Sequence, residues 1–114
     1  MKTPVAQTLR VKRSFGAGIA ALERKAAEAA GLLKLLANET RLLILCRLAL
    51  NGEMAVNELA AAAKLSQSAL SQHLAKMREE GLLATRRAAQ TVFYRIDHPD
   101  AARLLAVLKV IYCP

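Results

Sequence analysis

The sequence predicts a mainly α-helical domain that also holds one small β-hairpin. Aromatic residues make up only 4% of the 114 residues, and tryptophan is absent. Alanine and leucine dominate, a composition that favours helices over a β-sandwich or barrel. Apolar residues also recur at steps of three and four along most of the chain, whereas only residues 82–87 and 91–96 have the pattern of strands.

The first 17 residues differ from the rest, because they are polar and basic and include Pro4. We expect them to form a mobile basic arm that precedes one domain over residues 18–114. The domain begins with an apolar stripe that predicts a single helix from Gly18 to about Ala37. A chain of this length buries only a modest core, and a core shared between two copies would help its stability.

Four further helices are expected after residue 37, over residues 39–50, 56–63, 67–80 and 99–113. Asn38 and Ser66 are expected N-caps, because their side-chain oxygens can accept hydrogen bonds from free N–H groups of a first turn. Asn51-Gly52 is a typical C-cap turn. Asp97-His98-Pro99 starts the last helix, since proline suits a first turn.

The net charge of +8 is concentrated in two segments. Residues 1–30 and 64–96 each hold six basic and two acidic side chains, whereas the two remaining segments are balanced. Localised positive charge indicates that the protein binds a polyanion, most often nucleic acid. The charge alone does not exclude a basic surface that is only solvated. No apolar run approaches the ~20 residues of a membrane span and no signal-peptide pattern opens the chain, so we expect a cytoplasmic protein without a membrane partner.

Residues 56–80 predict two helices joined by a tight turn at Lys64-Leu65. The second helix has an apolar stripe on one face and small hydrogen-bonding side chains on the other, as a helix in the DNA major groove requires. The hairpin that follows has three arginines and no acidic residue from 84 to 96. A basic hairpin in this place is typical of a wing that contacts phosphates. The polar face alone would fit an ordinary amphipathic helix, but the three features in this order predict a winged helix-turn-helix.

Several runs resemble segments of the bacterial arsenic-repressor (ArsR) family. Residues 36–42 (LANETRL) are similar to the start of that family's second helix, and residues 65–74 (LSQSALSQHL) with 81–83 (GLL) to its recognition helix and exit. Residues 93–95 (FYR) match the return strand of its wing. The resemblance covers about residues 18–113. It implies a homodimer paired through its first and last helices, a pseudo-palindromic operator in double-stranded DNA, and release of that DNA when an inducer binds.

The resemblance also implies which side chains contact DNA. The recognition-helix candidates are Gln67, Ser68, Ser71, Gln72, His73 and Lys76, and the wing candidates are Arg86, Arg87, Gln90 and Arg95. His73 flanks the apolar stripe, so packing is as good an interpretation as contact. Two places depart from the family pattern. Lys64 stands where the turn often has glycine, so we expect strain there, and the wing loop 88–90 lacks the usual glycine or asparagine.

The two cysteines indicate which class of inducer the protein senses. Metal sensors of the family use thiolate clusters or Asp and His pairs that this chain lacks, and a zinc site wants about four close ligands, so we expect no metal and no cofactor. Cys46 and Cys113, within LCRL and IYC, are similar to cysteines of the sulfide-responsive subgroup that includes SqrR and BigR. The resemblance implies that reactive sulfur species (persulfides and polysulfides) bridge the two thiols and lower operator affinity. Two buried apolar cysteines are the structural alternative.

Other functions stay open on the sequence alone. The same DNA-binding domain could respond to peroxide through a disulfide, or to a metal ion. A non-switching architectural DNA-binding protein would show strong salt dependence and little sequence preference. A thiol oxidoreductase typically has a Cys-x-x-Cys unit in a βαβ context, and the sequence has neither. No other set of catalytic residues stands out, so we expect that the protein is not an enzyme.

Overall fold

The computed structural model describes residue 16 and residues 18–113, which divide into a unit that ends at Leu33 and a unit that begins at Lys34. The first unit contains α2 (Ile19–Arg24) and most of α3 (Ala26–Leu36). Apart from residue 16, the expected mobile arm lies outside the described residues. Its boundary at residue 17 therefore stays a prediction.

The prediction of one continuous helix from residue 18 to 37 was wrong, because the helix is interrupted at Lys25. Lys25 has φ −106° and ψ 19°, outside the helical region. Its N–H group is shared between the carbonyls of Ala21 and Leu22, at 3.2 and 3.1 Å, which is typical of a helix end that tightens in its last turn. The apolar spacing continues across this break, so the periodicity did not reveal it.

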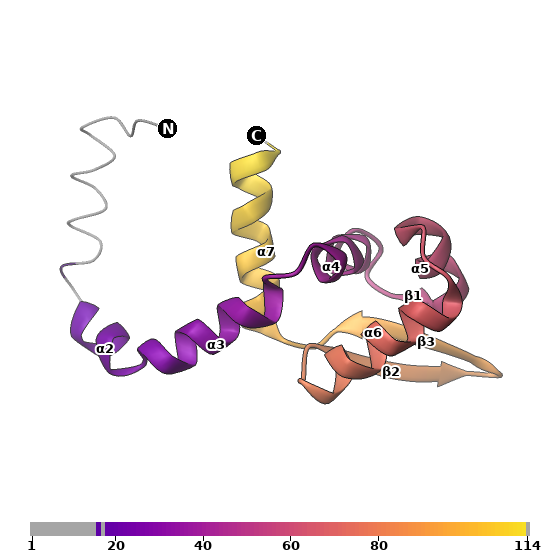
Figure 1. Cartoon of the computed structure of the whole chain (residues 1–114), viewed down its shortest axis with the longest axis horizontal. Helices are drawn as coiled ribbons and strands as arrows, with labels where there is room; N and C mark the ends of the chain where they lie inside the picture. Colours follow the sequence, from indigo (N-terminus) through magenta and orange to yellow (C-terminus); the bar gives the residue numbers. More distant parts are fainter. Residues whose placement is uncertain (1–15, 17, 114) are drawn as a thin grey trace. The chain divides into compact units, whose positions relative to one another are not determined.

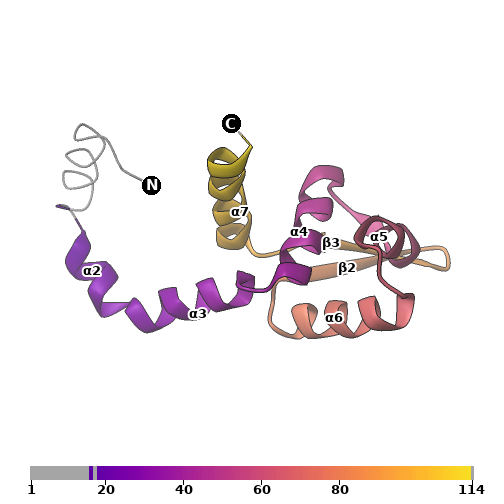
Figure 2. The same ribbon diagram turned by 45° about the horizontal axis from the view of Figure 1, so that its top comes forward.

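The second unit consists of helices around a small antiparallel sheet (Figures 1 and 2). The helices are α4 (Glu39–Asn51), α5 (Val56–Ala63), α6 (Gln67–Glu79) and α7 (Pro99–Tyr112), and the strands are β1 (Met54–Ala55), β2 (Leu83–Ala88) and β3 (Thr91–Ile96). The expected fold class, mainly α with a small hairpin, is confirmed. The short β1 was missed; it adds a third strand, in the order β1-β3-β2.

Three helix starts follow from local sequence. The side chains of Asn38 and Ser66 accept hydrogen bonds from the N–H groups of Arg41 and Ala69, at 3.0 and 3.1 Å. The Nδ1 atom of His98 accepts one from the Ala101 N–H group at 3.2 Å. Each bond satisfies an N–H group that has no partner within the helix. The expected caps at residues 38 and 66 and the helix start around residue 98 are therefore confirmed.

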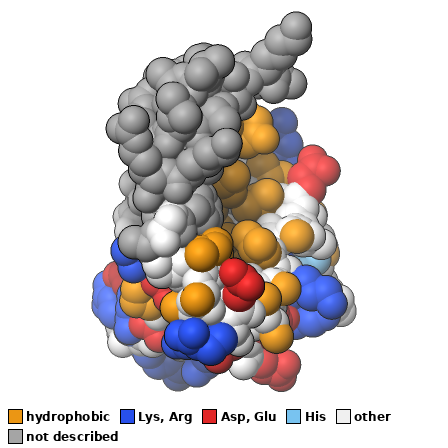
Figure 3. Space-filling model, turned by 90° about the vertical axis from the view of Figure 1, so that its left-hand side faces the viewer, with side chains coloured by type: hydrophobic (Ala, Val, Ile, Leu, Met, Phe, Trp, Pro, Cys, Tyr) orange, Lys and Arg blue, Asp and Glu red, His pale blue; other side chains and the backbone are white. Residues whose placement is uncertain are grey.

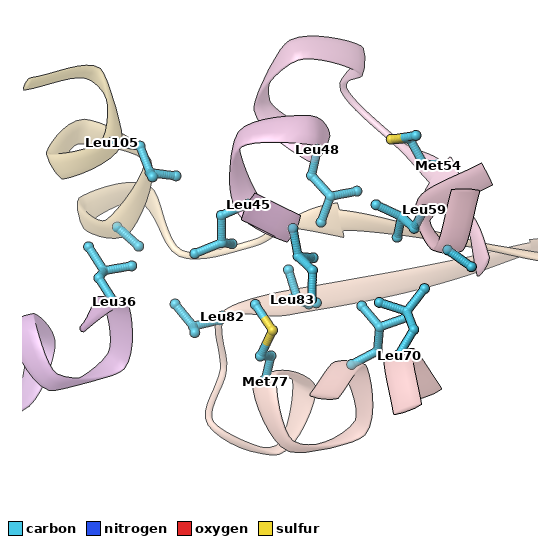
Figure 4. Close-up of a cluster of buried hydrophobic side chains, with 14 residues drawn as sticks. Leu36, Leu45, Leu48, Met54, Leu59, Leu70, Met77, Leu82, Leu83 and Leu105 are labelled. Atoms are coloured by element: carbon cyan, nitrogen blue, oxygen red, sulfur yellow. The ribbon is translucent and has the colours of Figure 1, made fainter. Parts of the chain in front are cut away.

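A cluster of buried apolar side chains fixes α6 against the rest of the second unit (Figure 4). Figure 4 shows Leu36 and Leu105 at one end of the cluster and Leu59 and Leu70 at the other. The three predicted core residues of α6 are fully buried: Leu70, Leu74 and Met77. Since these side chains point inward at steps of three and four, the other face of α6 is left for solvent.

Among residues 18–113, two residues other than glycine adopt the left-handed backbone conformation. Lys64, in the turn between α5 and α6, and Ala89, in the wing loop, both have φ 56°. This conformation costs an L-residue roughly 1–2 kcal/mol relative to the right-handed region. The strain expected at Lys64 is therefore confirmed, and the loop between β2 and β3 carries a comparable strain at its first residue.

Some apolar side chains remain at the surface. In the first unit Ile19, Leu22 and Leu33 are exposed, and one face of the molecule shows hydrophobic side chains among charged ones (Figure 3). In the second unit the exposed apolar side chains on α7 are Val107, Val110, Ile111 and Tyr112. Within the described part of the chain, no helix is both long and apolar enough to cross a membrane.

Candidate DNA interface and thiol pair

The polar face of α6 is available to a ligand. Of the residues predicted to contact DNA from this helix, these are exposed: Gln67, Ser68, Ser71, Gln72 and Lys76. His73 is half-buried, between the exposed face and the buried stripe. The helix thus presents short polar side chains and one lysine on one side, while the buried leucines anchor its other side. This arrangement suits an approach to base edges in a groove.

The strand register divides the wing arginines between two faces of the hairpin. Side chains alternate along a strand, and residues opposite each other on paired strands share a face. Arg87 therefore lies on the face of the buried Leu83, which packs into the core beside α6. Arg86 pairs with Phe93 and lies on the opposite face, together with Arg95. The predicted wing residues are all exposed, and the three arginines are divided between the two faces of the hairpin.

Arg86 has an acidic partner that sequence reasoning missed. Its Nε atom donates a hydrogen bond to Glu53 Oε1 over 2.7 Å, and its Nη2 atom contacts the same oxygen. The guanidinium carbon lies 4.8 Å from the centroid of the Phe93 ring, a cation–π arrangement. The hydrogen bonds from Arg86 lower the pKa of Glu53; burial opposes this shift, and the charges of Arg86 and Arg95 extend it.

A second ion pair fixes the C-terminal end of α6. Arg41 donates hydrogen bonds to both carboxylate oxygens of Glu80, at 2.9 and 2.6 Å, and a third to the carbonyl of Leu35 at 3.0 Å. Both side chains are mostly buried, with exposed fractions of 12% and 26%. The hydrogen bonds from Arg41 lower the pKa of Glu80. One arginine thus ties the end of α3, the first turn of α4 and the end of α6 together.

Both cysteines carry free, exposed thiols. Cys46 lies on α4, and Cys113 follows the last residue of α7, where its N–H group donates to the Lys109 carbonyl at 2.7 Å. The alternative that both are buried core residues is therefore wrong. The two helices that carry the thiols pack against each other through the core, in which Leu45 and Leu105 take part.

Among residues 16 and 18–113, no group of three or more His, Cys, Asp or Glu side chains is arranged to hold a metal ion. His98 caps the start of α7 instead, since its imidazole accepts a hydrogen bond from the Ala101 N–H group.

Comparisons with known proteins agree with the arrangement of these elements. A family model described as "Bacterial regulatory protein, arsR family" matches residues 38–85, from the start of α4 into β2. The chain is 49% identical over 92 residues to the transcriptional activator HlyU of Vibrio cholerae, covering 81% of this chain and 84% of HlyU. It is 46% identical over 93 residues to the biofilm growth-associated repressor of Agrobacterium fabrum, covering 82% and 79%.

A solved structure shows the same fold. The crystal structure of the transcriptional repressor BigR from Xylella fastidiosa superposes with a TM-score of 0.75 at 39% identity, over 83% of this chain and 96% of that chain. These relatives are named as transcriptional regulators and not as enzymes. On this sequence similarity, and with the winged helix-turn-helix described above, the chain belongs to the arsR family of bacterial regulatory proteins and is a DNA-binding transcriptional regulator.

Proposed function

We propose that the protein is a dimeric repressor that releases its operator when reactive sulfur species bridge Cys46 and Cys113. The observation that carries this proposal is the state of the two cysteines: both thiols are free and exposed, and α4, which holds Cys46, packs against α7, which Cys113 directly follows. Buried apolar residues would not need to be cysteine, whereas exposed thiols are open to sulfur transfer. BigR, whose structure is similar, is itself named a transcriptional repressor.

The operator would be read by α6 and held by the wing. Gln67, Ser68, Ser71 and Gln72 offer donors and acceptors to base edges, and His73 lies beside them. Lys76 and the wing residues Arg86, Arg87, Gln90 and Arg95 would contact phosphates, which set position and affinity but carry no sequence information. This assignment fits the uncharged side chains at residues 67–72 of α6 and the basic side chains of the hairpin.

Exposed apolar side chains support the homodimer. On α7, Val110 and Tyr112 are 73% and 78% exposed, which is costly in a chain that stays alone in water. Leu22 and Leu33 of the first unit are exposed as well. ArsR-family repressors bind operator DNA and typically act as dimers. Pairing through the first helices and α7 would cover these side chains and present two copies of α6 to half-sites about one helical turn apart.

Gln72→Ala is expected to weaken operator binding by roughly 5- to 150-fold for each half-site, because each lost base contact is worth about 1–3 kcal/mol. Binding to a scrambled duplex should change little. Lys76→Ala is the matched comparison on the same face of α6, and it should weaken binding to both duplexes alike, since a phosphate contact is independent of sequence. The operator for both measurements is enriched from a random-sequence pool by the wild-type protein. An equal loss on both duplexes for Gln72→Ala would contradict its role in base reading.

The proposed bridge forms in two successive exchange steps between the thiolates and a polysulfide. One thiolate attacks a polysulfide and acquires a short chain of added sulfur, displacing the remaining polysulfide as the leaving group. When that chain is two sulfurs long, the second thiolate attacks the added sulfur bonded to the first Sγ and displaces the terminal sulfur, which takes up a proton and leaves as hydrosulfide, so one sulfur remains between the two Sγ atoms. The thiolates lose two electrons, which reduce the sulfur that leaves. A direct disulfide requires Cα atoms about 4.4–6.8 Å apart, whereas a bridge with added sulfur spans a wider gap.

Polysulfide treatment of the reduced protein is expected to give an intramolecular bridge between Cys46 and Cys113 that contains extra sulfur, together with loss of operator binding. Intact-protein mass spectrometry distinguishes this product, because it gains sulfur and loses two hydrogens, while a disulfide only loses two hydrogens. The matched controls are Cys46→Ser and Cys113→Ser, which should keep operator binding after the same treatment. Peroxide is the second arm, applied to the same samples.

Each other outcome of this experiment points to a different inducer. A disulfide formed by peroxide with loss of DNA binding would identify a peroxide sensor. Thiols that stay free, or operator binding that ignores their state, would contradict both redox mechanisms while leaving the DNA-binding role intact. A protein that enriches no sequence from the pool would instead behave as an architectural DNA-binding protein.

A further inference from the structure

We propose that Glu53 competes with DNA phosphate for Arg86, and thereby limits the part of the DNA affinity that does not depend on sequence. The inference rests on the proposed DNA-binding role of the wing. It assigns a function to a residue that lies on neither α6 nor the hairpin, 33 positions before the arginine it contacts.

The contact resembles the way an arginine holds a phosphate. A single carboxylate oxygen, Glu53 Oε1, takes both the Nε and Nη2 donors of Arg86, which are the donors that form a fork for oxyanions. The Phe93 ring covers one face of the same guanidinium. Arg86 is therefore already bound by an anion when no DNA is present.

The pair is nevertheless open to exchange. Arg86 and Glu53 keep exposed side-chain fractions of 51% and 28%, so a phosphate oxygen can approach the guanidinium from solvent. Exposed ion pairs are weak, and a dense array of phosphates is a strong competitor for such an arginine. DNA must displace Glu53 from Arg86, or approach Arg86 while the carboxylate stays beside it.

Either route lowers DNA affinity. Displacement uses part of the attraction of Arg86 for phosphate to break the existing pair, and a carboxylate that stays repels the DNA backbone. The carboxyl group of Glu53 is ionised at neutral pH, as glutamate ordinarily is, and its hydrogen bonds from Arg86 lower its pKa further. Arg95, on the same face of the hairpin, lies close enough for its charge to act on Glu53 as well.

Glu53→Gln is the decisive variant, because the amide oxygen can still accept a hydrogen bond from Arg86 while the negative charge is gone. We expect it to tighten binding several-fold, and to a similar extent, on the enriched operator and on a scrambled duplex. A plot of log K against log salt should become steeper by about 0.9 for each wing, the value for one additional phosphate contact. Both quantities are measured by fluorescence anisotropy over a salt series.

The matched control is Glu39→Gln. Glu39 is exposed in the first turn of α4, whereas Glu53 follows the end of that 13-residue helix, so the two residues lie at opposite ends of a helix roughly 20 Å long. Both variants remove one negative charge from the same unit. Glu39→Gln should leave the salt slope unchanged, since it frees no arginine.

Arg86→Ala completes the test. In the wild-type background it should make the plot of log K against log salt less steep by less than about 0.9 for each wing, which is the value for one phosphate contact. The change is small because Glu53 already neutralises Arg86. In the Glu53→Gln background it should remove the whole increase that the first substitution produced. Equal effects of Arg86→Ala in the two backgrounds would overturn the competition.

The remaining outcomes separate this inference from the proposed function. If Glu53→Gln binds DNA with unchanged affinity, or binds less tightly while its thermal unfolding matches wild type, Glu53 only holds Arg86 in place and the inference is wrong. In that case the wild-type preference for the operator over the scrambled duplex would still stand. A wild-type protein without that preference would contradict the proposed function itself.

Discussion

Leu74→Ala is expected to lower the free energy of unfolding by about 2–5 kcal/mol. Leu74 is fully buried in the middle of α6, in the stripe that also contains Leu70 and Met77. The truncation removes buried methyl groups and leaves a cavity that close-packed neighbours fill only in part. A loss of this size is a large share of the total stability of a domain, which is typically about 5–15 kcal/mol.

The effect is measured by urea unfolding at a fixed protein concentration, because an associating protein gains stability with concentration. Leu50→Ala is the control, since Leu50 is 74% exposed on α4 and its truncation should change stability by no more than about 0.5 kcal/mol. Below its midpoint the Leu74→Ala protein should still prefer the operator, because the polar face of α6 is unaltered. Equal costs for the two leucines would mean that α6 is not anchored by this stripe.

Arg41→Ala is expected to destabilise the protein by about 1–3 kcal/mol, because it removes two hydrogen bonds to a carboxylate and one to a backbone carbonyl. It should also weaken operator binding, since Glu80 stands at the end of α6, the helix that we propose reads the operator. Arg41→Lys keeps the charge but cannot make the paired contact, so most of the loss should remain. Full recovery with lysine would contradict a role for the paired hydrogen bonds.

Glu80→Gln tests the same pair through pH. The folded-state pKa of Glu80 lies below its unfolded value of about 4.3, so the pair contributes its full stability above that pH. The contribution is lost as pH falls through the lower, folded-state pKa. The difference in unfolding free energy between wild type and Glu80→Gln should therefore be constant from neutral pH to about 5 and shrink in acid. The matched control is Glu79→Gln, which removes a charge from an exposed neighbour and leaves the hydrogen bonds between Arg41 and Glu80 in place.

Much of the fold could be predicted because its signals are local. Asn38 and Ser66 cap their helices within three residues of the N–H groups that they satisfy, and the buried stripe of α6 follows from spacing alone. The polar face of α6 followed from the same periodicity, since the side of a helix opposite a buried stripe is exposed.

Long-range features could not be predicted in this way. β1 has only two residues, and it is a strand because Met54 and Ala55 pair with Tyr94 and Phe93, far along the chain. The pairing of Glu53 with Arg86 spans 33 positions, so a basic hairpin in the sequence contains one arginine that is already neutralised. The exposure of Cys46 also depends on packing, because an α4 position next to Leu45 could equally have faced the core.

The strand register of the hairpin decides on which face of the wing each arginine lies. Arg86 and Arg87 are adjacent in sequence but lie on opposite faces, one beside Glu53 and Phe93 and the other on the core side. Inserting or deleting one residue in β2 before Arg86 would exchange the two faces, because the side-chain period of a strand is two. Arg87 would then lie on the face of Glu53, and Arg86 would lie on the opposite face. The composition and net charge of the protein would be almost unchanged. A substitution in this hairpin alters the contacts of one side chain. A change of length by one residue alters which face of the hairpin each of the following charged side chains occupies.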